Sequence, residues 1–375
     1  MDTASNRDET EAWLCLLRAP QLPASRLRDL VERHGSAAGA LAAARRGDGV
    51  DRAARTWLRK PDREAIANDL AWLAVDGHRL LTIDDAEFPP LLRESPGAPA
   101  GLFIAGDATV LWQPQIAIVG SRNASVGGLA NARSFARALA GAGLAITSGL
   151  AEGIDAAAHE AALESGAATI AVLGTGPDIV YPSRHRDLAA RIASAGALVS
   201  EFAPGTPGRK ENFPRRNRII AGLALGTLVV EAGLRSGSLI TARSASDQGR
   251  DVFAIPGSIH HPLARGCHQL IRNGAMLVES AGELIEALRP LAARLGAALR
   301  ERLDADGAQA GARPKRDPAY SRLLAALDHD ALGIDALAER TGLGAAALSA
   351  MLLDLELDGE VAAERGGLYV RRPAG

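Results

Sequence analysis

The feature that most constrains the fold of this chain is a series of seven short apolar runs in its central part. Each run is three to five residues long and is not alternated with polar residues, and helical segments and glycine-rich turns separate the runs. Such strands are typically buried on both faces, and strands that alternate with helices form parallel sheets. The sequence therefore predicts an α/β fold with a Rossmann-like parallel sheet. The expected strands are 116–119, 145–147, 169–173, 197–199, 227–230, 252–255 and 276–278.

Smaller domains are predicted on either side of this sheet. In residues 1–78 apolar side chains recur at intervals of three and four, which is typical of a small helical domain of the SAM or helix-hairpin type. Its turn at Arg33-His34-Gly35 would suit a contact with DNA phosphates through backbone amides, although a spacer or protein-contact bundle explains the pattern equally well. Residues 79–291 form the Rossmann-like domain, 292–316 a linker without usable periodicity, and 317–375 a winged-helix domain.

The predicted winged helix is acidic. Helices are expected at 320–327, 334–341 and 345–358, followed by a hairpin at 361–370. From Asp317 to the C-terminus there are ten acidic residues and five arginines, and the expected recognition helix contains no Lys or Arg. Phosphate binding requires local positive charge, so the composition favours a protein contact over the reading of duplex DNA.

Composition excludes several classes of protein. No stretch approaches the roughly 18 apolar residues that a membrane span requires, and the polar N-terminus is unlike a signal peptide, so we expect a cytoplasmic protein with no membrane contact. Cys15 and Cys267 lie far apart without a metal-ligand pattern, which predicts neither a disulfide framework nor a metal site. The net charge of −2 means that any site for a polyanion must be local.

The first strand runs directly into Gly120-Ser121-Arg122. Gly120 permits a tight turn, Ser121 is suited to cap a helix or to donate to a phosphate, and Arg122 supplies a permanent forked cation at the carboxyl end of the strand. Ligands of open α/β sheets bind at that edge. The alternative is a capped helix beside a solvated arginine.

The second strand is followed by small residues that expose backbone amides at the start of a helix. Ser148, Gly149 and Gly153 are expected to form an anion cradle there. Asp155 and His159 are four residues apart on that helix and would suit an acid/base pair, but no nucleophile is nearby and a structural pair is the favoured interpretation.

The densest basic segment is 209–221, in which five cations flank one aromatic residue. Cations that hold a backbone and an aromatic face for a base are what sequence-tolerant binding of single strands requires. The Asn-Phe-Pro run favours an extended and exposed Phe213, whereas a core position for this ring is the alternative. The candidate residues are Lys210, Asn212, Phe213, Arg216 and Arg218.

A Ser236-Gly237-Ser238 turn adds hydroxyls and amides after the fifth strand, entering another helix. Several anion-binding loops at one sheet edge suit a polymer or a nucleotide better than a small neutral metabolite.

These motifs, in their order along the chain, resemble the blocks of the DprA/Smf family. The resemblance covers about residues 80–281 closely, while the flanking domains are similar in layout only. It rests on Gly120-Ser121-Arg122, the runs 148–155, 212–221 and 231–242, Ala254-Ile255-Pro256-Gly257, and the block from Gly266 to Ala275.

The resemblance implies a homodimer that binds incoming single-stranded DNA and loads the RecA recombinase during natural transformation, without catalysis and without a cofactor. In that family the pocket uses residues that correspond to Arg122, Lys210 and the base-stacking Phe213. We add Arg216 and Arg218 on the ground of their charge alone.

An enzyme is the rival interpretation. Gly226, Thr227 and Glu231 resemble the end of the signature of lysine-decarboxylase-like nucleotide phosphoribohydrolases, in which Glu231 would be catalytic. The Pro-Gly-Gly that precedes this pattern in those enzymes is absent, because Ala224-Leu225 stands there.

Overall fold

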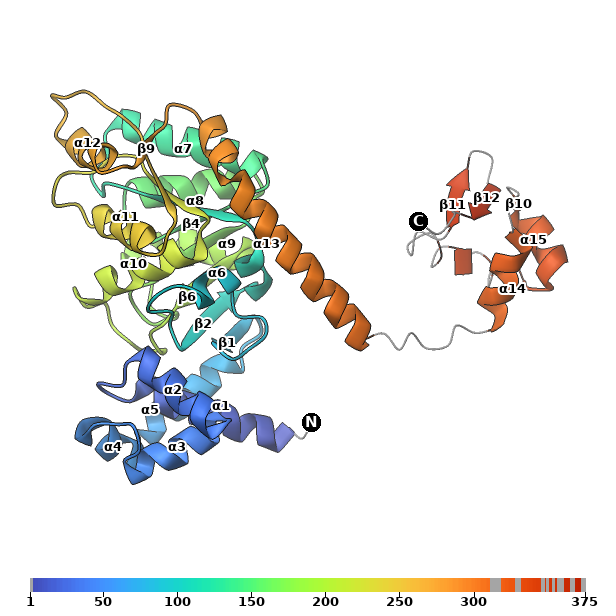
Figure 1. The fold of residues 1–375 in the computed structure, drawn as a ribbon, viewed down its shortest axis with the longest axis horizontal. Helices are drawn as coiled ribbons and strands as arrows, with labels where there is room; N and C mark the ends of the chain where they lie inside the picture. The colour runs from blue at the N-terminus through green and yellow to red at the C-terminus, as the bar shows by residue number, and fades with distance from the viewer. Residues whose placement is uncertain are drawn as a thin grey trace. The chain divides into compact units, whose positions relative to one another are not determined.

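The computed structural model describes residues 3–310, 318–327, 332–344, 348, 351–352, 355, 361–364 and 368–371. The chain divides into two compact units, residues 1–297 and residues 298–375. The first unit contains the helical part and the sheet together (Figure 1).

A nine-stranded sheet forms the centre of the first unit, in the order β1-β2-β6-β5-β4-β3-β7-β8-β9. The strands from β6 to β9 are parallel, and all seven strands expected from the sequence are present. Two strands that the sequence did not predict extend the sheet on the far side of β6. β2 pairs antiparallel with β6, and β1 pairs antiparallel with β2. The bounds are β1 His78–Thr82, β2 Gly101–Gly106, β3 Gln115–Val119, β4 Ala145–Ser148, β5 Thr169–Val172, β6 Ala197–Ser200, β7 Gly226–Val229, β8 Asp251–Ala254 and β9 Met276–Leu277.

Helices cover both faces of the sheet. One apolar core joins one face to α7 (Val126–Gly141), α8 (Ile154–Glu164) and the first part of α13, and α9 (Arg186–Ala195) packs on the same face beside α8. The other core joins the opposite face to α10 (Asn212–Leu223), α11 (Ser238–Asp247) and α12 (Arg265–Arg272). The helices change from one face of the sheet to the other where strand order reverses between β3 and β7, as right-handed crossovers require. Shorter elements are α6 (Pro90–Arg93) and the 3-10 turns Ala108–Trp112, Ser183–His185 and Pro262–Ala264.

The N-terminal part is helical, as the sequence predicts. Its core, which includes Trp13, Leu14 and Leu30, is continuous with the core of the sheet. The turn at Arg33-His34-Gly35 does not present free groups to a phosphate: Arg33 and His34 pair with Asp48, and the Gly35 amide donates to the Val31 carbonyl. The helices are α1 (Thr3–Arg18), α2 (Ala24–His34), α3 (Ala37–Arg46), α4 (Arg52–Arg59) and α5 (Arg63–Leu73).

A buried ion pair attaches the helical part to the sheet. The Arg18 guanidinium donates to both carboxylate oxygens of Asp69, at 2.5 and 2.6 Å, and to the carbonyl oxygen of Pro204 at 2.8 Å. Pro204 lies in the loop after β6. The pair therefore ties α1 and α5 to a loop at the edge of the sheet.

The expected linker at 292–316 is wrong over most of its length. Helix α13 runs from Ala281 to Ala310, and Leu284, Leu288 and Leu295 pack in the core that also holds α7 and α8. The alanine-rich and arginine-rich composition that obscured the periodicity is itself favourable to a helix. Residues 311–316 lie outside the described residues.

In the second unit, α14 (Pro318–Leu327), α15 (Ile334–Thr341) and strands β11 (Val361–Glu364) and β12 (Leu368–Arg371) agree with the expected elements. A short strand that the sequence did not predict, β10 (Leu332–Gly333), pairs with β12. The hairpin is antiparallel, with Val361 opposite Arg371. Most of the third expected helix, 345–358, lies outside the described residues.

The structure contains neither a disulfide nor a metal-binding cluster among the described residues. Both cysteines are buried and unpaired. In the described ranges, no helix is long and apolar enough to cross a membrane, and no group of three or more His, Cys, Asp or Glu side chains is arranged to hold a metal ion.

His159 has a structural role in packing α8 on the sheet. The side chain is fully buried, and its Nδ1 donates to Thr169 Oγ1 at 2.7 Å, while that hydroxyl donates to the Ile146 carbonyl. Burial lowers the pKa of His159 to about 3, so the ring is neutral in the folded protein.

We expect His159 to destabilise the fold in mild acid. Because an unfolded histidine has a pKa of about 6.5, the unfolded chain binds an additional proton between about pH 6.5 and pH 3. The free energy of unfolding should therefore fall as pH drops through that window. It should fall less steeply in His159→Gln, and the slopes of the two proteins should differ by at most about 1.4 kcal/mol per pH unit. Urea unfolding between pH 7 and pH 4 measures this, with exposed His260→Gln as the control; parallel curves for all three proteins would contradict the assignment.

Candidate functional site

A cavity of about 740 Å³ opens where strand order reverses, beyond the carboxyl ends of β3 and β7. This is the position at which open α/β sheets bind ligands. Loops that follow several different strands meet there. The lining residues on which the argument rests are Gly120, Ser121, Arg122, Tyr181, Lys210, Phe213, Arg235, Ser236 and Ser238.

The loop after β3 brings Arg122 to the cavity. A Cβ at Gly120 would lie 2.6 Å from Ile154 Cγ1, so only glycine fits this close approach of α8. Ser121 is buried, and its hydroxyl accepts from the Asn123 amide at 3.1 Å, which fixes the turn. The cap of α7 is Ser125 rather than Ser121. Arg122 is exposed and has no ion pair among the described residues.

Phe213 lies in the first turn of α10 rather than in an extended segment, which corrects the expectation from the sequence. Pro214 is tolerated there because the first turn of a helix leaves its amides unpaired in any case. The ring is half-buried and packs so closely on Gly174 that a Cβ there would lie 2.7 Å from Phe213 Cδ1. Tyr181 stands 5.2 Å from it between ring centroids, and the Arg122 guanidinium lies 5.9 Å from its centroid.

The structure therefore brings Arg122, Lys210 and Phe213 to one cavity from separate parts of the chain. Lys210 is exposed and unpaired among the described residues. Two further residues, Tyr181 and Arg235, were not among the predicted site residues. Tyr181 follows the glycine-rich turn after β5, and Arg235 directly precedes Ser236, so their places in the loops were the only available signal.

The loop after β4 does not offer a free anion cradle. The carboxylate of Asp155 accepts from the amides of Gly149 and Ala151, at 3.1 and 3.4 Å, and so occupies the positive end of α8 itself. Ser148 is buried and donates to the Ile118 carbonyl. A Cβ at Gly153, whose φ is +76°, would overlap the carbonyl oxygens of the loop after β3. These residues hold the two loops together.

Arg216 is not a free cation. Its side chain is buried, and it donates to the carbonyl oxygens of Gly149 and Val172 and to Asn217 Oδ1. Burial lowers the pKa of Arg216 to about 10, while burial raises the pKa of the nearby Asp155 and the guanidinium opposes that shift. The charge-based assignment of Arg216 to the ligand is therefore corrected to a structural role.

Arg218 and Asn212 also have partners inside the protein. Arg218 forms a two-pronged ion pair with Glu201, at 2.9 and 2.7 Å, and the Glu201 side chain is almost fully buried. This corrects the prediction that Arg218 contacts a ligand. Asn212 donates to the Gly174 carbonyl at 3.1 Å and so fixes the start of α10, with Phe213 beside it.

The start of α11 contributes two serine hydroxyls to the cavity. Ser236 Oγ and Ser238 Oγ lie 2.7 Å apart, and both residues line it. The first three amides of α11 already donate within the turn, to Ser236 Oγ, the Ser236 carbonyl and the Gly237 carbonyl, so hydroxyls rather than free amides are available to an anion.

Glu231, the residue on which the enzyme interpretation depends, is already engaged. Its two carboxylate oxygens accept from the Ser125 hydroxyl at 2.6 Å and from the Ser125 amide at 2.9 Å. These two hydrogen bonds fix Ser125, the cap of α7.

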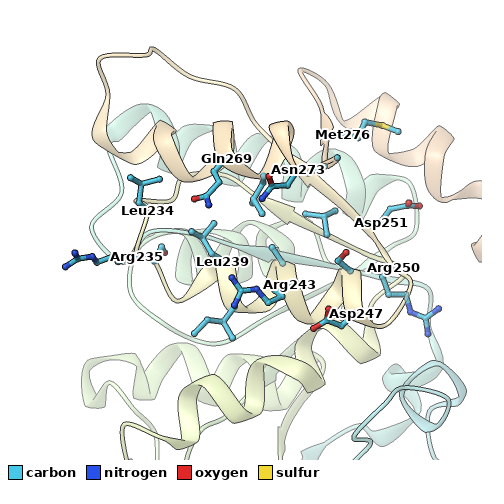
Figure 2. Close-up of a pocket in the computed structure, with 18 residues that line it drawn as sticks. Leu234, Arg235, Leu239, Arg243, Asp247, Arg250, Asp251, Gln269, Asn273 and Met276 are labelled. Atoms are coloured by element: carbon cyan, nitrogen blue, oxygen red, sulfur yellow. The ribbon is translucent and has the colours of Figure 1, made fainter.

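A second cavity of about 560 Å³ lies between α11 and α12 (Figure 2). Leu234, Leu239 and Met276 line it together with Arg243 and Arg250 from α11 and the turn after it. It adjoins the first cavity, since Ser236 and Ile240 line both.

The fold and the cavity define a doubly wound α/β protein with a cavity lined by exposed cations at its topological switch point. Sequence comparison specifies it further. Residues 79–289 match the family model of DNA recombination-mediator protein A, and residues 307–367 match the DprA winged helix domain. The chain belongs to the DprA/Smf family.

Individual relatives agree. The chain is 44% identical to Protein Smf of Escherichia coli K12 over 321 residues, covering 85% of this chain and 84% of that protein. It is 43% identical to DNA processing protein DprA of Streptococcus pneumoniae R6, over 60% of this chain and 87% of that protein.

Two solved structures are similar to the fold. That of DprA from S. pneumoniae has a TM-score of 0.66 at 36% identity, covering 74% of this chain and 97% of that chain. That of DNA processing protein A from Helicobacter pylori, described for its single-stranded DNA binding mode, has a TM-score of 0.51 at 28% identity, covering 56% of this chain and 96% of that chain.

We expect Arg216→Ala to unfold more easily than the wild type. The change leaves the Asp155 carboxylate buried without its cation and two carbonyl groups without a donor, which should cost about 3–5 kcal/mol of unfolding free energy. Urea unfolding measures the effect, and Arg209→Ala, which removes an exposed arginine without an ion pair among the described residues, serves as control. If Arg216→Ala were as stable as the wild type but lost its ligand, the charge-based assignment would be right after all.

Proposed function

We propose that this protein binds single-stranded DNA without catalysing a reaction on it. The binding site is the cavity of about 740 Å³ beyond the ends of β3 and β7, which we call the switch-point cavity. The observation that carries the proposal is the convergence of Arg122, Lys210 and Phe213 on one cavity, with both cations free of carboxylates among the described residues. The cations would hold phosphates, and the aromatic ring would stack on a base.

The surrounding structure supports this function over hydrolysis. The start of α11 adds the hydroxyls of Ser236 and Ser238 for a second phosphate, and Tyr181, which is 53% exposed, offers another aromatic face beside Phe213. Glu231, by contrast, has both carboxylate oxygens occupied by Ser125. The related H. pylori protein is described as binding single-stranded DNA.

Arg122→Ala and Lys210→Ala should each weaken the binding of oligo-dT by roughly tenfold, because each removes a charge-assisted phosphate contact. Each should also reduce the slope of log affinity against log salt by about 0.7, the value for one phosphate of a single strand. Fluorescence anisotropy over a series of salt concentrations measures both. Arg137→Ala, which removes an exposed arginine from α7, is the control, and unchanged affinity in both site variants would refute the cavity as the binding site.

Phe213→Ala should weaken binding by roughly one to two powers of ten, since stacking contributes about 1–3 kcal/mol per base. Because stacking releases no counterions, the salt slope should stay that of the wild type. Phe213→Leu keeps most of the packing on Gly174 but lacks the aromatic face, so it should bind as weakly as Phe213→Ala. Normal binding by Phe213→Leu, with an unchanged melting temperature, would show that the ring only packs.

The active species in this proposal is a homodimer. Strand β9 is an edge of the sheet, and Met276 and Leu277 on it are 47% and 43% exposed, beside the exposed Leu234. An open strand edge with apolar side chains is a ready surface for a second copy. Analytical ultracentrifugation at micromolar concentration tests this, and a monomeric mass would contradict it.

The role in the cell that we propose is the loading of RecA on single-stranded DNA during natural transformation, as the family resemblance implies. Strand exchange by RecA on strands coated with single-strand-binding protein, with and without this protein, tests the role. The acidic winged helix is assigned to protein contacts in this scheme, because excess negative charge opposes the approach of phosphates.

A further inference from the structure

The helical part of the chain carries a concentration of positive charge that the switch-point cavity does not use. Helix α4 and the end of α3 present six cations around one tryptophan, and we call this set the α4 surface. Three of its arginines are spaced i, i+3 and i+7 along α4, so they share one face of the helix. The members are Arg45, Arg46, Arg52, Arg55, Arg59, Lys60, Thr56 and Trp57.

Nearby carboxylates bind other groups rather than these cations. Asp48 is bound to Arg33 and His34, and Asp51 accepts from the Ala54 amide at 2.7 Å as the cap of α4. Asp62 accepts from the Ala65 amide and caps α5. Within the part of the chain that the structure describes, none of the six cations has an ion pair.

Helix stability explains only part of the pattern. Arg45, Arg46 and Arg59 stand in the last turns of α3 and α4, where the helix dipole favours cations. Arg52 is the first residue of α4, where the same dipole opposes a positive charge. Lys60 is the exposed C-cap residue of α4, where the dipole also favours a cation. Arg52 is therefore the cation for which a ligand is the better explanation, and Lys60 lies one helix length from it on the same surface.

Two hollows lie along α4. One, of about 800 Å³, is lined by Pro20, Gln21, Trp57 and Lys60, and the other, of about 440 Å³, by Gly47, Arg55 and Arg59. They adjoin, because Asp51, Arg52 and Thr56 line both. The result is a continuous shallow track with cations along it and the half-buried Trp57 ring in one wall.

The chain connects this track to the switch-point cavity. Gln21 is three residues from Arg18, which donates to the Pro204 carbonyl, and Pro204 is six residues before Lys210. At about 3.3–3.6 Å per residue these segments span at most about 11 and 22 Å. A strand of about 16 nucleotides, at the upper end of the length that a single-strand-binding fold occupies, would extend across both. In Figure 1, α4 lies on the same side of the view as α10 and α11.

We propose that the α4 surface is a second contact for the single strand held at the switch-point cavity, an inference that rests on the proposed function. Arg52 and Lys60 hold phosphates, and Trp57 stacks on a base. A single strand fits better than a duplex, because its bases are free to meet the Trp57 ring in a shallow track.

Binding of oligo-dT of two lengths by the full chain tests the proposal. Arg52→Ala/Lys60→Ala should leave a strand of about 6 nucleotides bound as in the wild type, since that length is filled at the switch-point cavity. For a strand of about 40 nucleotides, the affinity should fall about tenfold and the salt slope by about 1.4, the value for two phosphates. Arg133→Ala/Arg137→Ala removes the same charge from α7 and should bind both lengths normally.

Trp57 has its own test. Trp57→Ala should weaken binding of the long strand without changing the salt slope, and Trp57→Phe should restore most of it. Melting temperatures accompany both variants, because Trp57 also packs against the core. If Trp57→Ala is unstable, the result for Arg52→Ala/Lys60→Ala, which changes exposed residues only, decides the matter.

Three outcomes would overturn the proposal. Normal binding of the long strand by Arg52→Ala/Lys60→Ala would show that the α4 surface does not contact DNA. A loss confined to duplex of the same length would assign the surface to another ligand. Failure of the wild type to bind either length would refute the proposed function itself. If Arg122→Ala loses binding of both lengths while Arg52→Ala/Lys60→Ala binds both normally, the proposed function stands and only the α4 surface is refuted.

Discussion

The handedness of the connections between parallel strands is the constraint on which the rest of this structure depends. Right-handed crossovers place α7, α8 and α9 on one face while the chain moves from β3 to β6. When the chain returns to the other side of β3 to form β7, the same rule places α11 and α12 on the opposite face. The helices must separate at that point, and the cavity lies there because no helix covers it.

Charges at this cavity divide into two groups that differ in burial. Arg216 and Asp155 lie inside, where desolvation would be costly without partners, and they accordingly bind backbone groups of the loop after β4 and of the end of β5. Their bonds fix that loop in place. Arg122, Lys210 and Arg235 are exposed at the rim, where water solvates them. The buried network thus holds the loop and the sheet together, and in the proposed function the exposed cations would bind phosphates.

The helical part takes part in the same arrangement through Arg18. One guanidinium bonds to Asp69 of α5 and to Pro204 in the loop that leads to Lys210. The α4 surface and the switch-point cavity therefore belong to a single compact unit. For a polymer ligand, contacts held on one rigid unit act together, since fixing the strand at one of them lowers the entropy lost at the other.

The sequence by itself determined the parallel sheet and the sheet edge at which the cavity opens, because burial on both faces and glycine-rich turns leave local patterns. Its motif order also resembled the family to which the chain belongs. The sequence did not predict the antiparallel strands β1 and β2, because β2 pairs with β6, which lies far along the chain, and β1 pairs with β2. Only tertiary structure decided which cations of 209–218 are free: Lys210 is exposed, whereas Arg216 and Arg218 meet Gly149, Val172 and Glu201. Those partners come from other strands and loops, so nothing within the segment distinguishes a buried arginine from a binding one.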